Sequence, residues 1–195
     1  SILEKNITDK DFNEFYKQRK ALLIAFGNPL DEVVDFCKVV LQKEEKAIYY
    51  LTDSTRQEKE LILIMLEKYY QDKTKQDVEG ILSIVYPDLY SYIHDYRYNL
   101  PLLDKYFSIY THSKVINKVI PELEELMMQQ AKLREYNLLL EPRTSKICKI
   151  DKSNAQLYFM DAMGVEYLSF IIAKCKEKGL MANISICSAN LPSIT

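Results

Sequence analysis

Hydrophobic and polar positions divide the chain into segments that predict strands as well as helices. Two continuous apolar runs of buried-strand length occupy residues 21–26 and 47–51. Each run precedes a segment with apolar residues at helical spacing, residues 31–41 and 55–69. Because a continuous apolar run indicates a strand buried on both faces, two successive strand–helix units predict a small parallel sheet near the N-terminus.

The two helices of these units carry start signals. Asn28 is a candidate N-cap and Pro29 suits the first helical position, while Thr55 and Glu58 have the spacing of a capping box. The pattern then predicts two apolar stripes that face the core. They consist of Val33, Val34, Cys37, Val40 and Leu41 in the first helix and of Leu61, Ile62, Met65, Leu66 and Tyr69 in the second.

The middle of the chain, residues 76–140, has apolar and aromatic residues at helical spacing and no strong strand pattern. Pro121 suits the first turn of a long helix. Tyrosines gather in this stretch, and they have two interpretations. They could form a platform on which unpaired bases stack near Arg97, or they could pack on one another with their hydroxyl groups in water. Packing is favoured. These residues are Tyr86, Tyr90, Tyr92, Tyr96, Tyr98, Tyr106 and Tyr110.

The C-terminal part has the pattern of a strand, a helix and a second strand. The apolar run 157–160 ends on Asp161, a helix is predicted over 165–175, and residues 180–187 form the next run. Such a unit is parallel and right-handed, so the carboxyl ends of both strands lie at one edge of the sheet. We therefore expect Asp161 to lie close to the loop 190–195, at the edge where open α/β sheets bind ligands.

Asp161 has two interpretations. A carboxylate beside a hydroxyl suits metal-assisted phosphoryl or phosphodiester chemistry, because a cation held by the carboxylate lowers the pKa of a bound hydroxyl. An aspartate after a buried strand also commonly caps the following helix. The pattern alone leaves both roles open.

Charge and composition exclude several classes of protein. The chain has 26 Lys and Arg against 28 Asp and Glu, a net charge of −2, which is unlike an autonomous nucleic-acid or membrane-surface binder. Only 4 glycines are present, too few for Gly-rich phosphate loops or a glycine-punctuated β-sandwich. The 4 cysteines are far apart and are expected to be buried free thiols. Without a signal-peptide pattern or a long apolar run, we expect a cytoplasmic protein.

One local row of basic residues follows Pro142. It consists of Arg143, Lys146, Lys149 and Lys152, which recur every third residue. On a short helix beginning near Thr144 these side chains would follow one side, where they suit contacts to phosphate or nucleic acid. The alternative is an ordinary solvated helix face.

The residues after 156 resemble a known family. Segments 157–168 (LYFMDAMGVEYL) and 190–195 (NLPSIT) look like the opening of the PglZ domain, a branch of the alkaline phosphatase superfamily found in BREX phage-defence systems. Segments 51–61 and 129–137 resemble the regions that precede the catalytic core in such proteins. The resemblance therefore touches most of the chain.

This resemblance implies roles for particular residues. Asp161 would be a metal ligand, and Thr195 the nucleophile that also meets metal, with Ser193 shaping the loop. The metal of the complete protein would be a divalent cation, zinc above all. The family's later Asp and His ligands are not in this chain, and His94 and His112 are poor substitutes for them. We therefore expect an inactive N-terminal fragment that holds no metal tightly.

Together these observations predict an α/β protein in three parts. Residues 1–75 would form an N-terminal α/β module, 76–152 a helical connecting region, and 153–195 the first βαβ unit of an alkaline-phosphatase-like core. Its expected partners are other BREX proteins and a phosphodiester or nucleic-acid substrate, without a membrane. The alternative is a non-catalytic interaction module, in which residues 1–150 dock onto other defence components. A signal-receiver-like or nucleotide-binding domain is disfavoured because no P-loop or Gly-rich turn is present.

Overall fold

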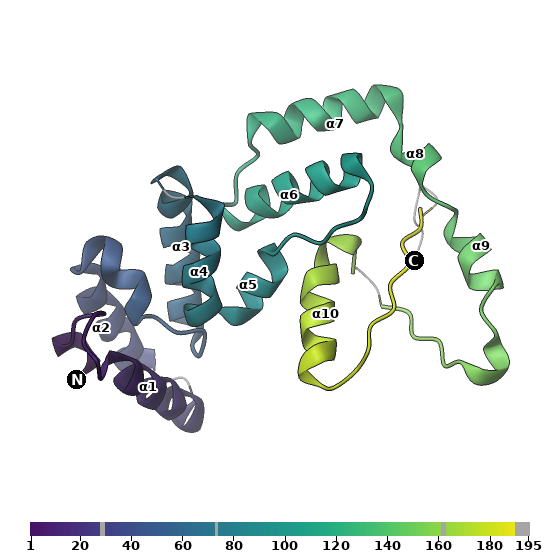
Figure 1. Ribbon diagram of the computed structural model, residues 1–195. Helices are drawn as coiled ribbons and strands as arrows, with labels where there is room; N and C mark the ends of the chain where they lie inside the picture. Colours follow the sequence, from purple (N-terminus) through teal and green to yellow (C-terminus); the bar gives the residue numbers. More distant parts are fainter. Residues whose placement is uncertain (28–29, 73, 161–162, 190–195) are drawn as a thin grey trace. The chain divides into compact units, whose positions relative to one another are not determined.

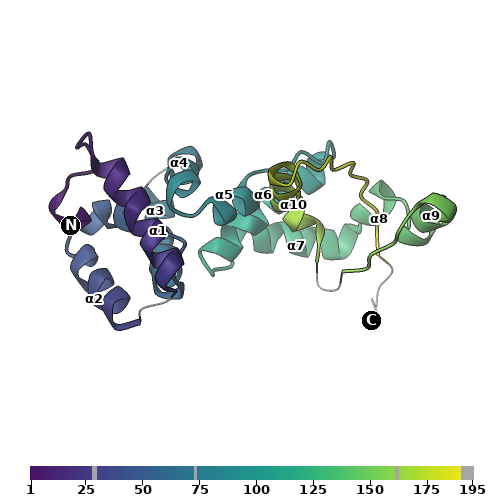
Figure 2. The same cartoon turned by 90° about the horizontal axis from the view of Figure 1, so that it is seen from below.

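The computed structural model describes residues 1–27, 30–72, 74–160 and 163–189 (Figure 1). The chain divides into two compact units. Unit 1 comprises residues 1–91 with 115–117, and unit 2 comprises residues 92–114 with 118–195. Both are built from helices, which Figure 2 shows from a second side.

Unit 1 contains both long helices and short 3-10 segments. In chain order these are η1 (Ile2–Glu4), α1 (Phe12–Phe26), α2 (Leu30–Leu41), η2 (Glu44–Tyr50), α3 (Arg56–Asp72), α4 (Lys75–Val85) and the start of α5 (Pro87–Ile93). Helix α3 lies beside both α2 and α4, and η2 also contacts those two helices (Figure 1). The centre of the core is therefore built around η2 and α3: Ile48 of η2, Leu51 just after it and Ile62 of α3 are fully buried.

Several predicted helices are confirmed. Helices α2 and α3 cover the two predicted apolar stripes, and Val33, Val40 and Leu66 are buried as expected. Thr55 and Glu58 do interact at the start of α3, where the Glu58 N–H donates to Thr55 Oγ1 over 3.3 Å. These residues therefore begin α3 as the sequence predicts.

The predicted strand over residues 21–26 is wrong, because these residues form the second half of α1. No helix-breaking residue separates the run from the helical pattern before it. Phe12, Tyr16 and Leu23 are buried at intervals of four and seven residues, which is one face of an α-helix. The apolar residues on either side of Leu23 point outward, since Leu22 is 56% and Ile24 67% exposed.

This correction predicts opposite effects for two neighbouring residues. We expect Leu23→Ala to lower the free energy of unfolding by about 2 kcal/mol, since it leaves a cavity under α1. Ile24→Ala should change it little, because the Ile24 side chain is already in water. Urea denaturation of the two variants measures the difference. Equal losses would indicate that the run is buried on both faces, as in the predicted strand.

The second predicted strand, residues 47–51, is also wrong. Residues Glu44–Tyr50 form the 3-10 helix η2, whose period of three residues places 47 with 50 and 48 with 51. All four of those side chains are buried, namely Ala47, Tyr50, Ile48 and Leu51. The continuous apolar run thus reflects a short helix enclosed by its neighbours.

Unit 2 contains two long helices and several shorter elements. They are α6 (Pro101–Val115), α7 (Pro121–Leu133), α8 (Tyr136–Leu139), α9 (Arg143–Cys148), η3 (Lys152–Asn154), η4 (Val165–Tyr167) and α10 (Leu168–Glu177), with α6 ending in unit 1. Pro121 begins α7 as predicted. Aromatic rings pack on one another here, for example Tyr98 on Phe107 at 5.1 Å between ring centroids. The Tyr98 hydroxyl donates to the carbonyl of Val165 at the start of η4.

The predicted βαβ unit of a catalytic core is not formed, and the predicted α/β fold is wrong. Helix α10 lies where a helix is predicted, but residues 157–160 and 180–187 are irregular. Within the described ranges no strand is present, and the one bridge is an isolated parallel pair between Pro142 and Ser188. Strand hydrogen bonds require a neighbouring strand, so an apolar run without one does not become a strand. Phe159 is instead 78% exposed.

Over the residues that the structure describes, no helix is both long and apolar enough to span a membrane.

Candidate partner-binding site

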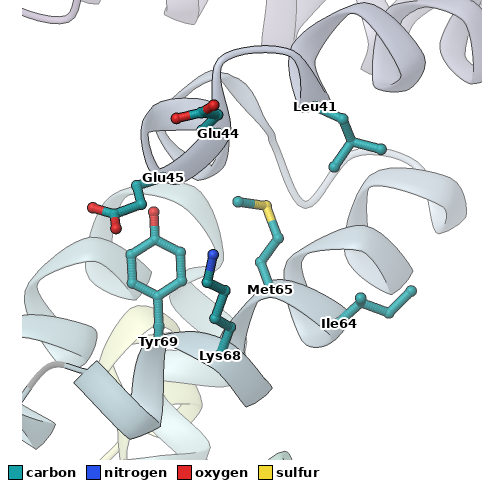
Figure 3. Close-up of a pocket in the computed structure, with 7 residues that line it drawn as sticks. All are labelled: Leu41, Glu44, Glu45, Ile64, Met65, Lys68 and Tyr69. Carbon is teal, nitrogen blue, oxygen red and sulfur yellow. The ribbon is translucent and has the colours of Figure 1, made fainter.

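An open groove lies in unit 1 where the end of α2, the start of η2 and the outer side of α3 meet (Figure 3). Its volume is about 340 Å³. The lining residues come from these three segments: Leu41 from α2, Glu44 and Glu45 from η2, and Ile64, Met65, Lys68 and Tyr69 from α3. The four α3 residues lie on two successive turns, so they form one continuous wall.

The floor of the groove is apolar and open to water. The Ile64 side chain is 68% exposed and that of Leu41 is 49% exposed. Met65 is half-buried and stands at the centre of Figure 3, with its thioether pointing toward η2. Covering apolar side chains of this size is favourable by about 25 cal/mol per Å². A methionine also adapts its shape to different partners.

The rim of the groove carries negative charge on one side and positive charge on the other. Glu44 and Glu45 stand on the η2 side, and Lys68 rises from α3 on the other (Figure 3). In the described part of the chain, no ion pair joins Lys68 to either glutamate. The two carboxylates are therefore available to a cation from outside the chain.

The turn that presents these carboxylates is strained. Glu44 has a φ of 52°, in the left-handed region that favours glycine or asparagine. The neighbouring Lys43 ammonium lies over the Tyr50 ring, 4.6 Å from its centroid, and Tyr50 is buried. Packing thus holds the turn in this conformation, and strain of this kind is concentrated at functional positions.

Tyr69 closes the groove on its inner side. The residue is buried, and its ring stands next to Glu45 in Figure 3. Burial, with smaller effects from Tyr49 and Glu45, raises the pKa of the Tyr69 hydroxyl to about 12. Tyr69 therefore keeps its proton at neutral pH and adds no negative charge to the rim.

A buried polar cluster joins several segments of unit 1 at the start of α3. Glu58 on α3 is fully buried, and its Oε1 accepts from the Arg19 guanidinium at 2.7 Å and from the Thr52 N–H at 3.0 Å. Its Oε2 accepts from the hydroxyls of Thr52 and Thr55. Arg19 also lies over the Phe36 ring of α2, 3.5 Å from its centroid. The Glu58 carboxylate thus links α3 to α1 and to the loop that follows η2. Arg19 extends this contact to α2.

Comparison with known proteins gives one result for this region. Residues 1–69 match a family described as Domain of unknown function (DUF7863). The match ends at Tyr69, so it includes every residue that lines the groove and the Glu58 cluster. No curated protein and no solved structure matches the chain.

The residues predicted to act in catalysis fall outside the described part of the chain. Asp161 and the loop 190–195, with Ser193 and Thr195, are among the positions that the structure leaves undescribed. Among the described residues, no group of three or more His, Cys, Asp or Glu side chains could hold a metal ion. We therefore derive no metal-dependent step from them. The cysteines are free as predicted, but Cys148 is exposed and the others are only partly buried.

The predicted basic row does lie partly on one short helix, α9, which holds Arg143 and Lys146. Lys146 and Lys149 both pair with the carboxylate of Glu141, the first at 3.3 Å. Hydrogen bonds from Lys149, Ser145 and Lys146 lower the pKa of Glu141 to about 2. Part of the positive charge of the row is therefore balanced within the chain, while the backbone of Lys152 lies apart in η3.

The sequence pattern does not predict the groove. It assigns Met65 and Tyr69 to the inward stripe of α3 and Leu41 to that of α2, whereas Leu41 is exposed. The available signal was Ile64, an apolar residue beside that stripe rather than within it. The sequence does not assign Glu44 and Glu45 to the groove, because their position depends on η2 being a helix instead of a strand.

Proposed function

We propose that unit 1 is a docking module of a PglZ-type phage-defence protein of the BREX kind. Its groove would bind a basic amphipathic helix from another protein of that system. The observation that carries this proposal is the exposed apolar floor, formed by Leu41, Ile64 and Met65, beside two carboxylates without a partner in the described part of the chain. The resemblance of residues 51–61 to PglZ-type proteins supports the choice of system.

An amphipathic helix suits the shape and chemistry of the groove. Such a helix presents apolar side chains three and four residues apart, the spacing that fits between two helical walls. Its cations would face Glu44 and Glu45, and its polar or acidic residues would face Lys68. Charge complementarity of this kind selects the partner and its orientation more than it adds affinity.

The proposal is tested by removing the rim carboxylates. We expect Glu44→Gln with Glu45→Gln to weaken binding to one separately purified BREX protein about tenfold at low salt, with a smaller effect at high salt. The matched control is Asp31→Asn with Glu32→Gln, which removes the same charge from the exposed start of α2. Isothermal titration measures both. Equal weakening by the two pairs, or binding of the wild-type chain to none of these proteins, would contradict the proposal.

A second candidate function concerns the complete protein. The similarity of residues 157–168 and 190–195 to the PglZ domain supports metal-dependent hydrolysis of a phosphoester, in which Asp161 and Thr195 would meet a divalent cation such as zinc. This candidate rests on the motif alone. The whole protein would therefore combine docking through unit 1 with phosphoester chemistry elsewhere.

The second candidate predicts weak zinc binding by this chain. Zinc sites in proteins usually use three or four side-chain ligands, and the motif assigns only Asp161 and Thr195 here. Calorimetric titration with zinc should give a weak signal that Asp161→Ala removes. Tight stoichiometric binding, or an unchanged signal in Asp161→Ala, would show that these roles are assigned wrongly.

A further inference from the structure

Unit 2 contains a cavity of about 500 Å³ that belongs to no site considered above. It is lined by α6, α7, the turn at α8, Val165 of η4 and the irregular segment 186–189, and it opens to solvent on one side. Its walls are mostly apolar and aromatic, including Tyr106, Phe107, Met127 and Tyr136. None of the described residues that line it carries a charge. The volume lies within the range of about 300–1,000 Å³ that is typical of small-molecule sites.

The side chain of Gln130 in this wall has an oxygen atom without a hydrogen-bond donor among the described residues. Gln130 on α7 is 8% exposed, and its side-chain N–H₂ donates to Glu135 Oε2 at 2.7 Å. Because a carboxylate only accepts hydrogen bonds, this contact fixes which end of the amide is the oxygen. The Oε1 atom of Gln130 is buried and accepts no hydrogen bond from the described part of the chain. A buried acceptor without a donor is costly, and a bound donor would remove that cost.

We propose that this cavity binds a small neutral aromatic molecule that carries one N–H or O–H donor, which Gln130 Oε1 accepts. The rings of Tyr106, Phe107 and Tyr136 favour a flat aromatic body. The absence of a cation among the described lining residues disfavours anions such as carboxylates or phosphates. Gln130 would act as the residue that selects ligands with a donor.

A pair of probes that differ in their donor tests this proposal. The first is 5-fluoroindole, which has an N–H, and the second is 5-fluoro-1-methylindole, which has none. Titrations followed by fluorine NMR should show that the chain binds 5-fluoroindole about tenfold more tightly. Gln130→Met keeps a side chain of similar length without the acceptor, so the preference should disappear. Gln129→Met, an exposed neighbour outside the cavity wall, should retain it.

A second variant tests the cavity itself. Ala131 lines the cavity but is exposed on α7, so Ala131→Phe fills space without disturbing a buried position. We expect it to abolish binding of both probes while the helical circular dichroism stays unchanged. The proposal is overturned if neither probe binds the wild-type chain at millimolar concentration, if Ala131→Phe binds them normally, or if the preference survives in Gln130→Met. If Gln130→Met loses its helical circular dichroism, binding of the probes to Ala131→Phe decides whether the cavity is the binding site.

Discussion

Replacing Glu58 with alanine is expected to lower the free energy of unfolding of unit 1 by about 3–5 kcal/mol. The Glu58 side chain has an exposed fraction of 0% and that of Arg19 16%, so removing the carboxylate leaves a largely buried guanidinium without its partner. It also deprives Thr52 and Thr55 of their acceptor. Hydrogen exchange of peptides from α1 and α3 in the full chain, followed as urea is added, measures the loss.

Two comparisons make this result specific. Glu60→Ala removes an exposed carboxylate that pairs with Arg56 on the same helix, and it should leave stability nearly unchanged. Replacing both buried partners, Arg19→Met with Glu58→Leu, should cost clearly less than the sum of the two single changes, because no charge is then left unpaired. Additive losses, or a loss in Glu58→Ala no larger than in Glu60→Ala, would contradict the proposed role of the cluster.

Ile64→Glu is expected to weaken binding of the partner helix by about a hundredfold. The change places a charge on the apolar floor, where a docked helix would remove it from water without a partner. Because Ile64 is exposed in the free chain, the fold should be unaffected. The matched control is Ile84→Glu, which makes the same change at a 55% exposed isoleucine of α4 outside the groove. Titration of both variants with the purified BREX protein of the proposed complex measures the effect.

Wild-type affinity in Ile64→Glu would contradict the location of the site. An equal loss in both variants would also contradict it, because binding would then respond to the added negative charge wherever it stands. Thermal melts of the two variants should match that of the wild-type chain, which separates a binding effect from a folding effect.

Long helical patterns in this chain were predictable from the sequence, and short apolar runs were not. Val33 and Val40 of α2 are buried as their spacing indicates. Helix α10 is closed by Gly179, whose φ of 68° a glycine adopts readily. Residues 21–26 and 47–51 are too short for periodicity to separate a strand from a buried helical segment. Their neighbours decide the outcome, since one run continues α1 and the other coils into η2.

The groove depends on those same local outcomes. Glu44 and Glu45 stand on its rim only because η2 is a 3-10 helix, and its first residue, Glu44, has a positive φ. A strand at this place would have pointed successive side chains to opposite faces. The exposure of Ile64 likewise depends on how α2 packs against α3, and the sequence of α3 alone does not reveal that packing.

Hydrogen–deuterium exchange of the full chain, with and without a bound BREX protein, decides whether the groove is the docking site. We predict that the partner slows exchange in residues 41–45 and 64–69, the segments that line the groove, and leaves α4 unchanged. Protection that appears only in other segments, or no change at 41–45 and 64–69 in a sample where the complex has formed, would contradict the proposed function.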